Sequence, residues 1–212
     1  MQVFNFFRSG ASHRLRIALE LKGLAYEYIA VDLRREEQFT AAFRAMNPQG
    51  FVPVLKDGDS VLLQSPAILE WLEERYPTPA LLPADPLSRQ RVRALAAIVG
   101  CDIHPLNNRR ILEYLRHTLQ CEQDAVTAWC RHWIDAGFDA YEALLGQSAP
   151  HGDYSFGDTP TLADVYLIPQ IASARRFGVA LDRYQKILAI EGRCLALPAF
   201  ARAAPSRQPD AD

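Results

Sequence analysis

A short polar turn near the start of the chain carries the residue types that could bind an anion. Ser9, Gly10 and Ser12 lie where an apolar segment gives way to a helix-like pattern, with arginines on either side. The first N–H groups of a helix lack intrahelical partners and carry partial positive charge, so an anion is favoured there, and a hydroxyl can donate to it. The turn is therefore a candidate anion or thiolate site, although Ser9 or Ser12 acting only as an N-cap would explain the same residues.

Two further dipeptides in the first half could bind a peptide-like ligand. Val52-Pro53 opens a strand pattern. A cis bond there would turn the Val52 backbone outward to pair with an extended ligand, but the spacing alone favours an ordinary trans proline. Gln64-Ser65 precedes Pro66, which predicts Ser65 as N-cap and proline at the first helical position. The same helix start could also hold a carboxylate.

Polar segments of the second half allow two interpretations each. Residues 104–110, His-Pro-Leu-Asn-Asn-Arg-Arg, interrupt a helical stretch. Either Asn107 caps the next helix and both arginines face solvent, or one arginine faces a ligand, because adjacent helical residues point to different faces. Arg175-Arg176 has the same ambiguity near a helix C-terminus, where cations are favoured anyway. Thr161 to Asp164 is typical of a capping box, and we assign Asp164 no catalytic role.

The elements that position these residues follow from the periodicity of the first 76 residues. The predicted order is β-α-β-α-β-β-α, with strands at 2–7, 26–31, 52–55 and 61–63 and helices at 12–22, 36–46 and 65–76. A βαβ start implies a parallel pair with a right-handed crossover, and the Asp57-Gly58 turn adds an antiparallel hairpin. We therefore expect a small mixed sheet of thioredoxin-like type.

Prolines at 77, 79, 83 and 86 mark a domain boundary, because each removes a donor and disfavours helix just before it. Beyond them the pattern predicts helices at 87–100, 106–119, 122–146, 161–177 and 184–195, with no convincing strand. The last residues, 203–212, are expected to fray. The predicted fold is an α/β thioredoxin-like domain over residues 1–80 and an all-α domain over residues 86–205.

Composition excludes several classes of function. The 212 residues carry a net charge of −2, which gives no electrostatic reason to expect nucleic acid or an anionic membrane as partner. No apolar run is long enough to span a bilayer and no signal peptide is visible, so we expect a cytoplasmic protein. The four cysteines, at 101, 121, 130 and 194, fit neither a disulfide scaffold nor a metal site.

The order and spacing of these features resemble the cytosolic glutathione transferases over nearly the whole chain. Residues 9–19, Ser-Gly-Ala-Ser-His-Arg-Leu-Arg-Ile-Ala-Leu, look like the zeta-class signature S-S-C-x-W-R-V-R-I-A-L. That class contains maleylacetoacetate and maleylpyruvate isomerases. The wider match, including residues 101–110, is closest to the bacterial glutathione-dependent maleylpyruvate isomerases. The resemblance implies a glutathione transferase fold, glutathione as cofactor and a homodimer.

The resemblance also assigns roles to individual residues. Ser9 would donate to the glutathione sulfur, and the Val52 backbone, ahead of the family's cis-proline at Pro53, would pair with the cysteinyl unit. Gln64 and Ser65 would hold the γ-glutamyl carboxylate. The other residues implied in glutathione binding are Gln49, Asp102 (reaching across the dimer), His104 and Asn108.

The activity implied is cis–trans isomerisation of a small acidic ene-dione. Such a reaction needs transient loss of double-bond character, which reversible thiolate addition supplies without a general base or a metal. Arg8, Arg110 and Arg176 are the cations expected to face the substrate's carboxylates. Gly10 replaces the second Ser of the signature and Ala11 replaces its Cys, so a mechanism that needs this cysteine is excluded.

Three functions remain open at this point. The first is conversion of maleylpyruvate to fumarylpyruvate in gentisate-type aromatic degradation. The second is maleylacetoacetate isomerisation in tyrosine breakdown, or a zeta-class transferase activity on α-halo acids. The third is a non-catalytic binding module of the same fold, against which Ser9 and the arginines argue. Both acids share the reacting ene-dione, so the sequence does not separate them.

Overall fold

The computed structural model describes residues 1–147 and 152–211, which form two compact units. The first unit contains Met1–Leu81 together with the chain from Leu195 onward, and the second contains Leu82–Cys194. The C-terminal segment therefore groups with the N-terminal unit, whereas the sequence pattern assigns residues up to 205 to the helical half. The ranges 1–80 and 86–205 remain a prediction of where each domain begins and ends.

The first unit is built on a four-stranded mixed sheet. Its strands are β1 (Gln2–Asn5), β2 (Glu27–Ala30), β3 (Val54–Asp57) and β4 (Ser60–Leu63), in the order β2-β1-β3-β4. β1 is parallel to β2 and antiparallel to β3, and β3 and β4 form the hairpin predicted from Asp57-Gly58. The predicted thioredoxin-like arrangement of an α/β domain is confirmed.

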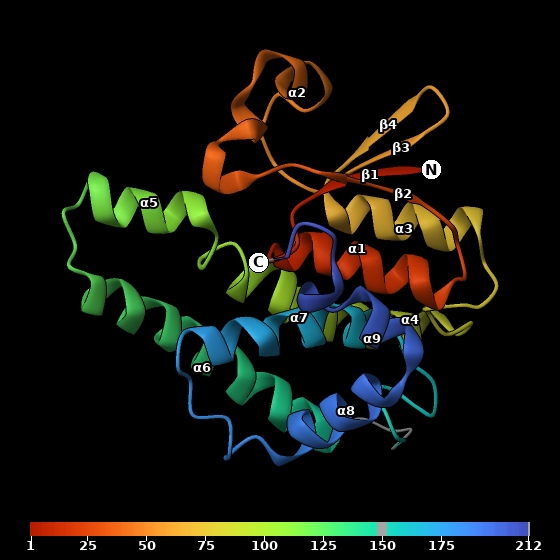
Figure 1. The fold of residues 1–212 in the computed structure, drawn as a ribbon. Helices are drawn as coiled ribbons and strands as arrows, with labels where there is room; N and C mark the ends of the chain where they lie inside the picture. The colour runs from red at the N-terminus through yellow and green to blue at the C-terminus, as the bar shows by residue number, and fades with distance from the viewer. Residues whose placement is uncertain (148–151, 212) are drawn as a thin grey trace. The chain divides into compact units, whose positions relative to one another are not determined.

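Helices cover both faces of this sheet (Figure 1). They are α1 (Gly10–Leu21), α2 (Ala41–Met46), α3 (Ser65–Arg75) and α9 (Pro198–Ala203). Because side chains alternate along a strand, Val54 joins the cluster that includes Phe43 of α2, while Val3 and Leu55 are buried on the opposite face. α1 and α3 pack together on that opposite face, and α9 packs on α1.

The helix predicted at 36–46 is shorter than expected. Glu36 has a φ of 59°, in the left-handed region that a helix interior does not allow, and it separates two short 3₁₀ turns at Leu33–Arg35 and Glu37–Phe39. The α-helix begins only after Thr40, whose hydroxyl accepts a hydrogen bond from the Phe43 N–H. A capping threonine inside the predicted helix thus moves its start by several residues.

The predicted fraying of residues 203–212 is wrong for the described part, 203–211, and Asp212 lies outside the described residues. The Gln208 side chain donates to the carbonyl oxygens of Arg202 and Ala204, both at 2.8 Å. The Asp210 carboxylate accepts a hydrogen bond from the Phe7 N–H at 3.1 Å and another from the Tyr28 hydroxyl. Tertiary partners far away in the sequence therefore order a segment whose composition is that of a mobile tail.

The second unit is helical, as predicted. Its helices are α4 (Pro86–Ala97), a π-helical segment η3 (Ile98–Ile103) that continues it, α5 (Arg109–His117), α6 (Gln123–Gln147), α7 (Leu162–Arg176) and α8 (Gln185–Ala196). Residues 148–151 of the predicted all-α domain lie outside the described residues. Gly137 of α6 packs directly on Ile103, where an added Cβ would lie 2.3 Å from the isoleucine side chain. A glycine is therefore needed for the π-helical segment to contact α6.

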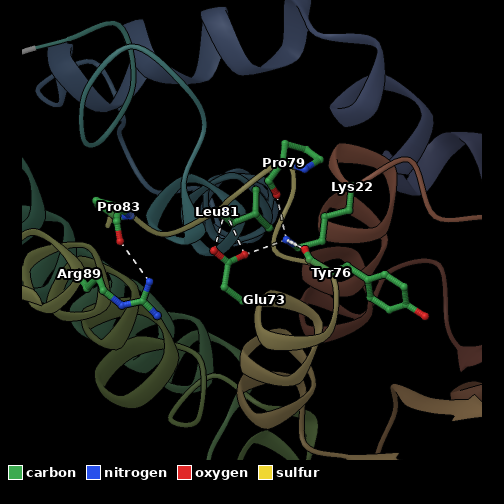
Figure 2. A network of polar contacts seen from close by, with 7 residues as sticks. All are labelled: Lys22, Glu73, Tyr76, Pro79, Leu81, Pro83 and Arg89. Atoms are coloured by element: carbon green, nitrogen blue, oxygen red, sulfur yellow. Dashed lines mark hydrogen bonds and ion pairs between the residues drawn. The ribbon is translucent and has the colours of Figure 1, made fainter. Parts of the chain in front are cut away.

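The proline-rich segment after α3 is anchored by a buried ammonium group (Figure 2). Lys22, just after α1, donates to the Glu73 carboxylate at 2.8 Å and to the carbonyl oxygens of Tyr76 and Pro79 at 2.7 and 2.9 Å. Glu73 in turn accepts from the Leu81 N–H at 3.0 Å. The segment predicted to be a linker is thus fixed to α1 and α3 up to Leu81.

Candidate functional site

The candidate residues fall in both compact units. In the first unit, Ser9 caps α1: its Oγ accepts from the Ser12 N–H at 3.2 Å, and its carbonyl accepts from the His13 N–H at 2.8 Å. Ser12 is buried, with its hydroxyl 3.5 Å from the Phe6 N–H, so the cap is Ser9.

The cap geometry leaves donors available at the start of α1. The Ser9 hydroxyl accepts one hydrogen bond and, among the described residues, donates none. The N–H groups of Gly10 and Ala11 also bond to no group in the described part of the chain. Three donors around a half-buried serine, at the positive end of a helix, suit a thiolate or another anion. The cap and the anion site are therefore compatible interpretations of the same residue.

Two arginines flank an aromatic pair next to this turn. The Phe6 and Phe7 rings meet edge to face with centroids 4.8 Å apart, and the guanidinium carbon of Arg8 lies 5.9 and 5.2 Å from their centroids. Arg34 lies at 5.6 and 5.7 Å from the same rings, but it is paired with Asp32 at 2.9 Å. Its hydrogen bond lowers the pKa of Asp32 to about 2. Arg8 has no acidic partner within the described residues, so it is the cation available to a ligand.

The Val52–Pro53 peptide bond is cis, so the trans bond favoured by spacing alone is wrong and the isomer implied by the resemblance is present. Pro53 directly precedes β3. Within the described residues neither the N–H nor the carbonyl of Val52 makes a hydrogen bond. A buried residue with both backbone groups unpaired at a strand start can form a two-bond antiparallel pair with an extended ligand.

Gln64, Ser65 and Gln49 are brought together at the start of α3. The N-cap is Gln64, one residue earlier than predicted, and Ser65 is the first helical residue. Gln64 has a φ of 66°, which is uncommon for a residue other than glycine and is frequent at functional sites. Its side-chain amide donates to the Gln49 side chain at 2.5 Å. The buried Ser65 hydroxyl bonds to no group among residues 1–147 and 152–211, so it is free to bind a carboxylate.

In the second unit, the segment between α4 and α5 carries three predicted residues. Asp102 is exposed on the π-helical turn, and His104 ends that turn with its N–H bonded to the Val99 carbonyl at 2.9 Å. The cap of α5 is Asn108, whose Oδ1 accepts from the Arg110 N–H at 3.1 Å. The alternative that Asn107 caps this helix is therefore wrong, and Asn108 keeps only its amide NH₂ for a ligand.

One arginine of each adjacent pair, Arg109 and Arg175, forms an ion pair with a carboxylate. Arg109 bonds to Glu113 one turn along α5 at 3.4 Å. Arg175 forms a two-point ion pair with the buried Glu191 carboxylate, which raises the pKa of the arginine. Arg176 is exposed, with one nitrogen 3.1 Å from the Ser173 hydroxyl and its guanidinium carbon 5.0 Å from the Phe177 ring centroid. Arg109 and Arg175 thus have carboxylate partners, and the expectation that Arg110 and Arg176 face a ligand stays a prediction.

Helix α6 bonds to both of the segments that carry these predicted residues. Trp129 donates its indole N–H to the Leu106 carbonyl at 2.9 Å, between His104 and Asn108. Arg131 donates to the Phe177 carbonyl at 2.7 Å, directly after Arg176, and lies against Gly178. Two side chains two residues apart on α6 therefore fix the backbone that carries the predicted residues of this unit.

Asp164 is structural, as predicted. It accepts from the Thr161 N–H at 2.7 Å and from the Ser155 N–H at 2.9 Å, completing the capping box of α7. Burial raises the pKa of this carboxyl group, but every oxygen has a donor. The mechanism of the capping box accounts for the residue fully.

Gln38 is a candidate that the sequence analysis missed. Its side chain is buried, and its Oε1 accepts no hydrogen bond within the described residues. Its carbonyl oxygen lies against Gly50, so it is close to the segment that carries Gln49 and Val52. Nothing in the local pattern marks it, because a glutamine inside a charged stretch is ordinary.

The chain's own thiols and any metal chemistry are less suited to a reaction. Burial raises the pKa of Cys130 to about 11 and that of Cys194 also, so neither is a good nucleophile near neutral pH. Within residues 1–147 and 152–211, no three acidic, histidine or cysteine side chains gather as metal ligands, and no helix could cross a membrane. Because Ala11 stands where the zeta-class signature has its cysteine, a reactive thiolate beside Ser9 would belong to a ligand.

Both halves of the chain match a known protein family. Residues 8–75 match the family model described as glutathione S-transferase, N-terminal domain, and residues 123–189 match that of the C-terminal domain. The chain is 66% identical over 210 residues to the maleylpyruvate isomerase of a Ralstonia species, covering 99% of both chains.

Several solved structures match over the whole chain. A holo maleylpyruvate isomerase, a bacterial glutathione transferase of zeta class, has a TM-score of 0.98 and 65% identity over all of both chains. The maleylacetoacetate isomerase of Methylobacterium extorquens AM1, solved with malonate and glutathione bound, has a TM-score of 0.96 and 39% identity over all of both chains.

Proposed function

We propose, since this chain belongs to the zeta class of the glutathione S-transferase family, that it is a glutathione-dependent isomerase that converts maleylpyruvate to fumarylpyruvate. This reaction is chosen because the chain is similar to the Ralstonia maleylpyruvate isomerase over nearly all of both chains. Glutathione is the cofactor of the family, and the relative from Methylobacterium binds it together with a small dicarboxylate.

Three features of the first unit suit glutathione. The unpaired N–H and carbonyl of Val52, next to Pro53, can pair with the cysteinyl backbone of an extended tripeptide. The free Ser65 hydroxyl and the N-terminus of α3 suit the γ-glutamyl carboxylate, and Gln64 with its partner Gln49 adds amide donors. We propose these as the cofactor contacts, and Gln38 as a further polar group beside them.

The Ser9 turn would then set the ionisation of the cofactor. When bound, glutathione supplies a nucleophilic thiolate whose reversible addition turns the cis double bond into a rotatable single bond. A free thiol has a pKa of about 8.5 and is mostly protonated at neutral pH. The Ser9 hydroxyl and the N–H groups of Gly10 and Ala11 can stabilise the charged form, and each pKa unit of depression corresponds to about 1.4 kcal/mol.

The arginines would bind the two carboxylates of the substrate. Arg8, Arg110 and Arg176 are the proposed cations, as the resemblance to the zeta class implies, and Arg175 is the neighbour already paired with Glu191. A guanidinium binds a planar carboxylate through two parallel hydrogen bonds and stabilises charge that develops on a conjugated oxygen. No general base is required of the chain.

The remaining assignments follow the family. We propose a homodimer in which Asp102 approaches the glutathione bound by the partner subunit, with His104 and the Asn108 amide along the same segment. A cytoplasmic location, and a place in gentisate-type aromatic degradation, belong to the same proposal.

The second candidate reaction is maleylacetoacetate isomerisation. The M. extorquens relative with that activity in its name matches the fold over the full chain. Both acids present the same ene-dione between a carboxylate and an acyl group, so the arginines and Ser9 suit either. Transfer of glutathione to α-halo acids is a third use of the same thiolate.

Turnover of purified protein decides between these reactions. Maleylpyruvate consumption is followed by absorbance with and without glutathione, and maleylacetoacetate is assayed in parallel. We expect conversion of maleylpyruvate only when glutathione is present, with a higher kcat/KM than for maleylacetoacetate. Faster maleylacetoacetate turnover would favour the second candidate, and no turnover of either acid with glutathione bound would leave a binding module.

A further inference from the structure

The backbone of Phe7, two residues before Ser9, is held at both its N–H and its carbonyl. Its carbonyl accepts from a guanidinium nitrogen of Arg16 at 2.9 Å, and its N–H donates to the Asp210 carboxylate at 3.1 Å. Neither partner is a neighbour in the chain: Arg16 lies on the buried face of α1, and Asp210 lies in the C-terminal segment of the same unit.

Both partners are fixed in turn. Arg16 is fully buried and also donates to the Asn5 side chain at 2.8 Å and to the Ala203 carbonyl at 3.0 Å. The second Asp210 oxygen accepts from the Tyr28 hydroxyl of β2. The position of the carboxylate is therefore determined by a strand of the sheet, and that of the guanidinium by the last helix.

The Ser9 N–H bonds to the Phe6 carbonyl at 3.0 Å, so Phe6 to Ser9 form one tight turn. A shift of the Phe7 peptide would therefore move the Ser9 hydroxyl and the first N–H groups of α1 together. Displacements near 1 Å at a reacting centre reduce rates by about a hundredfold. The rate of a reaction at Ser9 should therefore depend on the orientation of this turn.

We propose that Asp210 is a positioning residue: through the Phe7 N–H, the C-terminal segment sets the orientation in which Ser9 donates to the cofactor's sulfur. This role rests on the proposed function of Ser9 in the same site. It assigns to residues 204–211 a part in the reaction chemistry of the N-terminal unit, although their composition is that of a fraying tail.

Other charges near the turn make the sign of the effect informative. The charged and titratable groups around it are Arg8, His13, Arg16, Tyr28, Arg34 and Asp210. If Asp210 acted only through its negative charge, removing that charge would lower the pKa of a nearby thiol. If it acts by positioning Ser9, its removal raises that pKa, because the thiolate loses a donor.

The test compares Asp210→Ala, Asp210→Asn and Asp210→Glu, with Asp59→Ala in the exposed β3–β4 turn as a matched loss of one carboxylate. The pKa of the bound glutathione thiol is measured from its ultraviolet thiolate absorbance as a function of pH, with each protein saturated. The temperature of half-unfolding and the isomerase kcat and KM are measured on the same samples.

Asp210→Ala should raise the pKa of the bound thiol by about one unit, a roughly tenfold loss of thiolate, and lower kcat more than it changes KM. Asp210→Asn should stay near wild type, since its carboxamide oxygen still accepts from the Phe7 N–H. Asp210→Glu keeps the charge but displaces the oxygens, and should resemble Ala. If Asp210→Ala does not fold, the difference in thiol pKa between Asp210→Asn and Asp210→Glu still tests the positioning role.

An unchanged or lowered thiol pKa in the Ala variant, or Asn behaving like Ala while Glu behaves like wild type, would overturn the positioning role. The titration needs bound glutathione and no turnover. A wild-type protein that ionises glutathione but leaves maleylpyruvate unconverted therefore contradicts the proposed reaction alone, and the comparison of variants still decides the role of Asp210.

Discussion

The buried Lys22–Glu73 pair makes a quantitative prediction about stability. Lys22→Met removes the donor to the Glu73 carboxylate and to the carbonyls of Tyr76 and Pro79 (Figure 2). The side chains of Lys22 and Glu73 are only 0% and 6% exposed, so the value of about 1 kcal/mol or less for a surface pair does not apply. Loss of one partner of a buried pair costs about 3–5 kcal/mol, because the other charge remains buried.

That loss is large compared with the stability of a typical domain, about 5–15 kcal/mol. It corresponds to a fall of roughly 6–20 °C in the temperature of half-unfolding for a chain of this size. Glu73→Gln should cost less, since the ammonium keeps two carbonyl acceptors. Adding Glu73→Gln to Lys22→Met should recover roughly 1–3 kcal/mol, because no buried charge is then unpaired and the Leu81 N–H keeps its acceptor.

Urea unfolding at pH 7, followed by tryptophan fluorescence and circular dichroism, measures these free energies. The matched control is Arg193→Met, because Arg193 also pairs with a carboxylate, Asp153, and donates to a carbonyl, but with side chains 46% and 66% exposed. It should cost about 1 kcal/mol or less. If Lys22→Met lowers the free energy of unfolding no more than Arg193→Met does, burial does not set the strength of these ion pairs and the reasoning is refuted.

Three further predictions concern the site and the pH response. Ser9→Ala should raise the pKa of the bound thiol and lower kcat about a hundredfold, as loss of one charge-stabilising donor does. Ser9→Thr keeps the hydroxyl and should therefore keep more of the kcat. An unchanged kcat in the Ala variant would contradict this role. Arg176→Ala should raise KM for maleylpyruvate at least about tenfold, because the substrate loses a carboxylate partner. Arg175→Ala should leave KM near wild type and lower the unfolding temperature, because Glu191 loses its ion-pair partner. The opposite pattern would exchange the two assignments. Burial, with a smaller effect of Arg16, lowers the pKa of His13 to about 3 from about 6.5 in the unfolded chain, so only the unfolded state gains a proton as pH falls below about 6.5. The free energy of unfolding should therefore drop by about 2 kcal/mol between pH 7.5 and 5 because of this residue. Urea unfolding at several pH values measures that drop, and a His13→Leu variant whose free energy of unfolding falls with pH as much as that of wild type would disprove the role of His13.

Local patterns predicted the parts of the fold whose causes are local. The Asp57-Gly58 hairpin and the capping box ending at Asp164 each depend on residues within a few positions, and both are present. For the first helix the pattern left Ser9 and Ser12 open as caps, and the cap is Ser9. The alternative cap of α5 at Asn107 was off by one residue, since Asn107 and Asn108 are both good caps by type and the side chain that accepts from the Arg110 N–H is that of Asn108.

The long-range parts of the site had no local signal. Arg175 and Arg176 are indistinguishable in sequence, and the difference comes from Glu191 on another helix. Asp210 meets Phe7 across 203 positions, so no spacing rule connects them. The cis bond at Val52–Pro53 likewise became an expectation only through family resemblance, because proline at a strand start is more often trans.

The discontinuity of the first unit affects the order in which the protein is synthesised and folded. A ribosome makes β1 to α3 first, but the carbonyl of Ala203 that binds Arg16, and the α9 surface that covers α1, emerge more than a hundred residues later. Domains usually fold as units during synthesis, with the N-terminal one first. Here a nascent N-terminal unit carries a guanidinium that lacks one of its three acceptors and an uncovered helix face until α9 is made. The Ser9 turn can therefore reach its full set of tertiary contacts only after the residues from Leu195 onward have been made and have folded back onto α1.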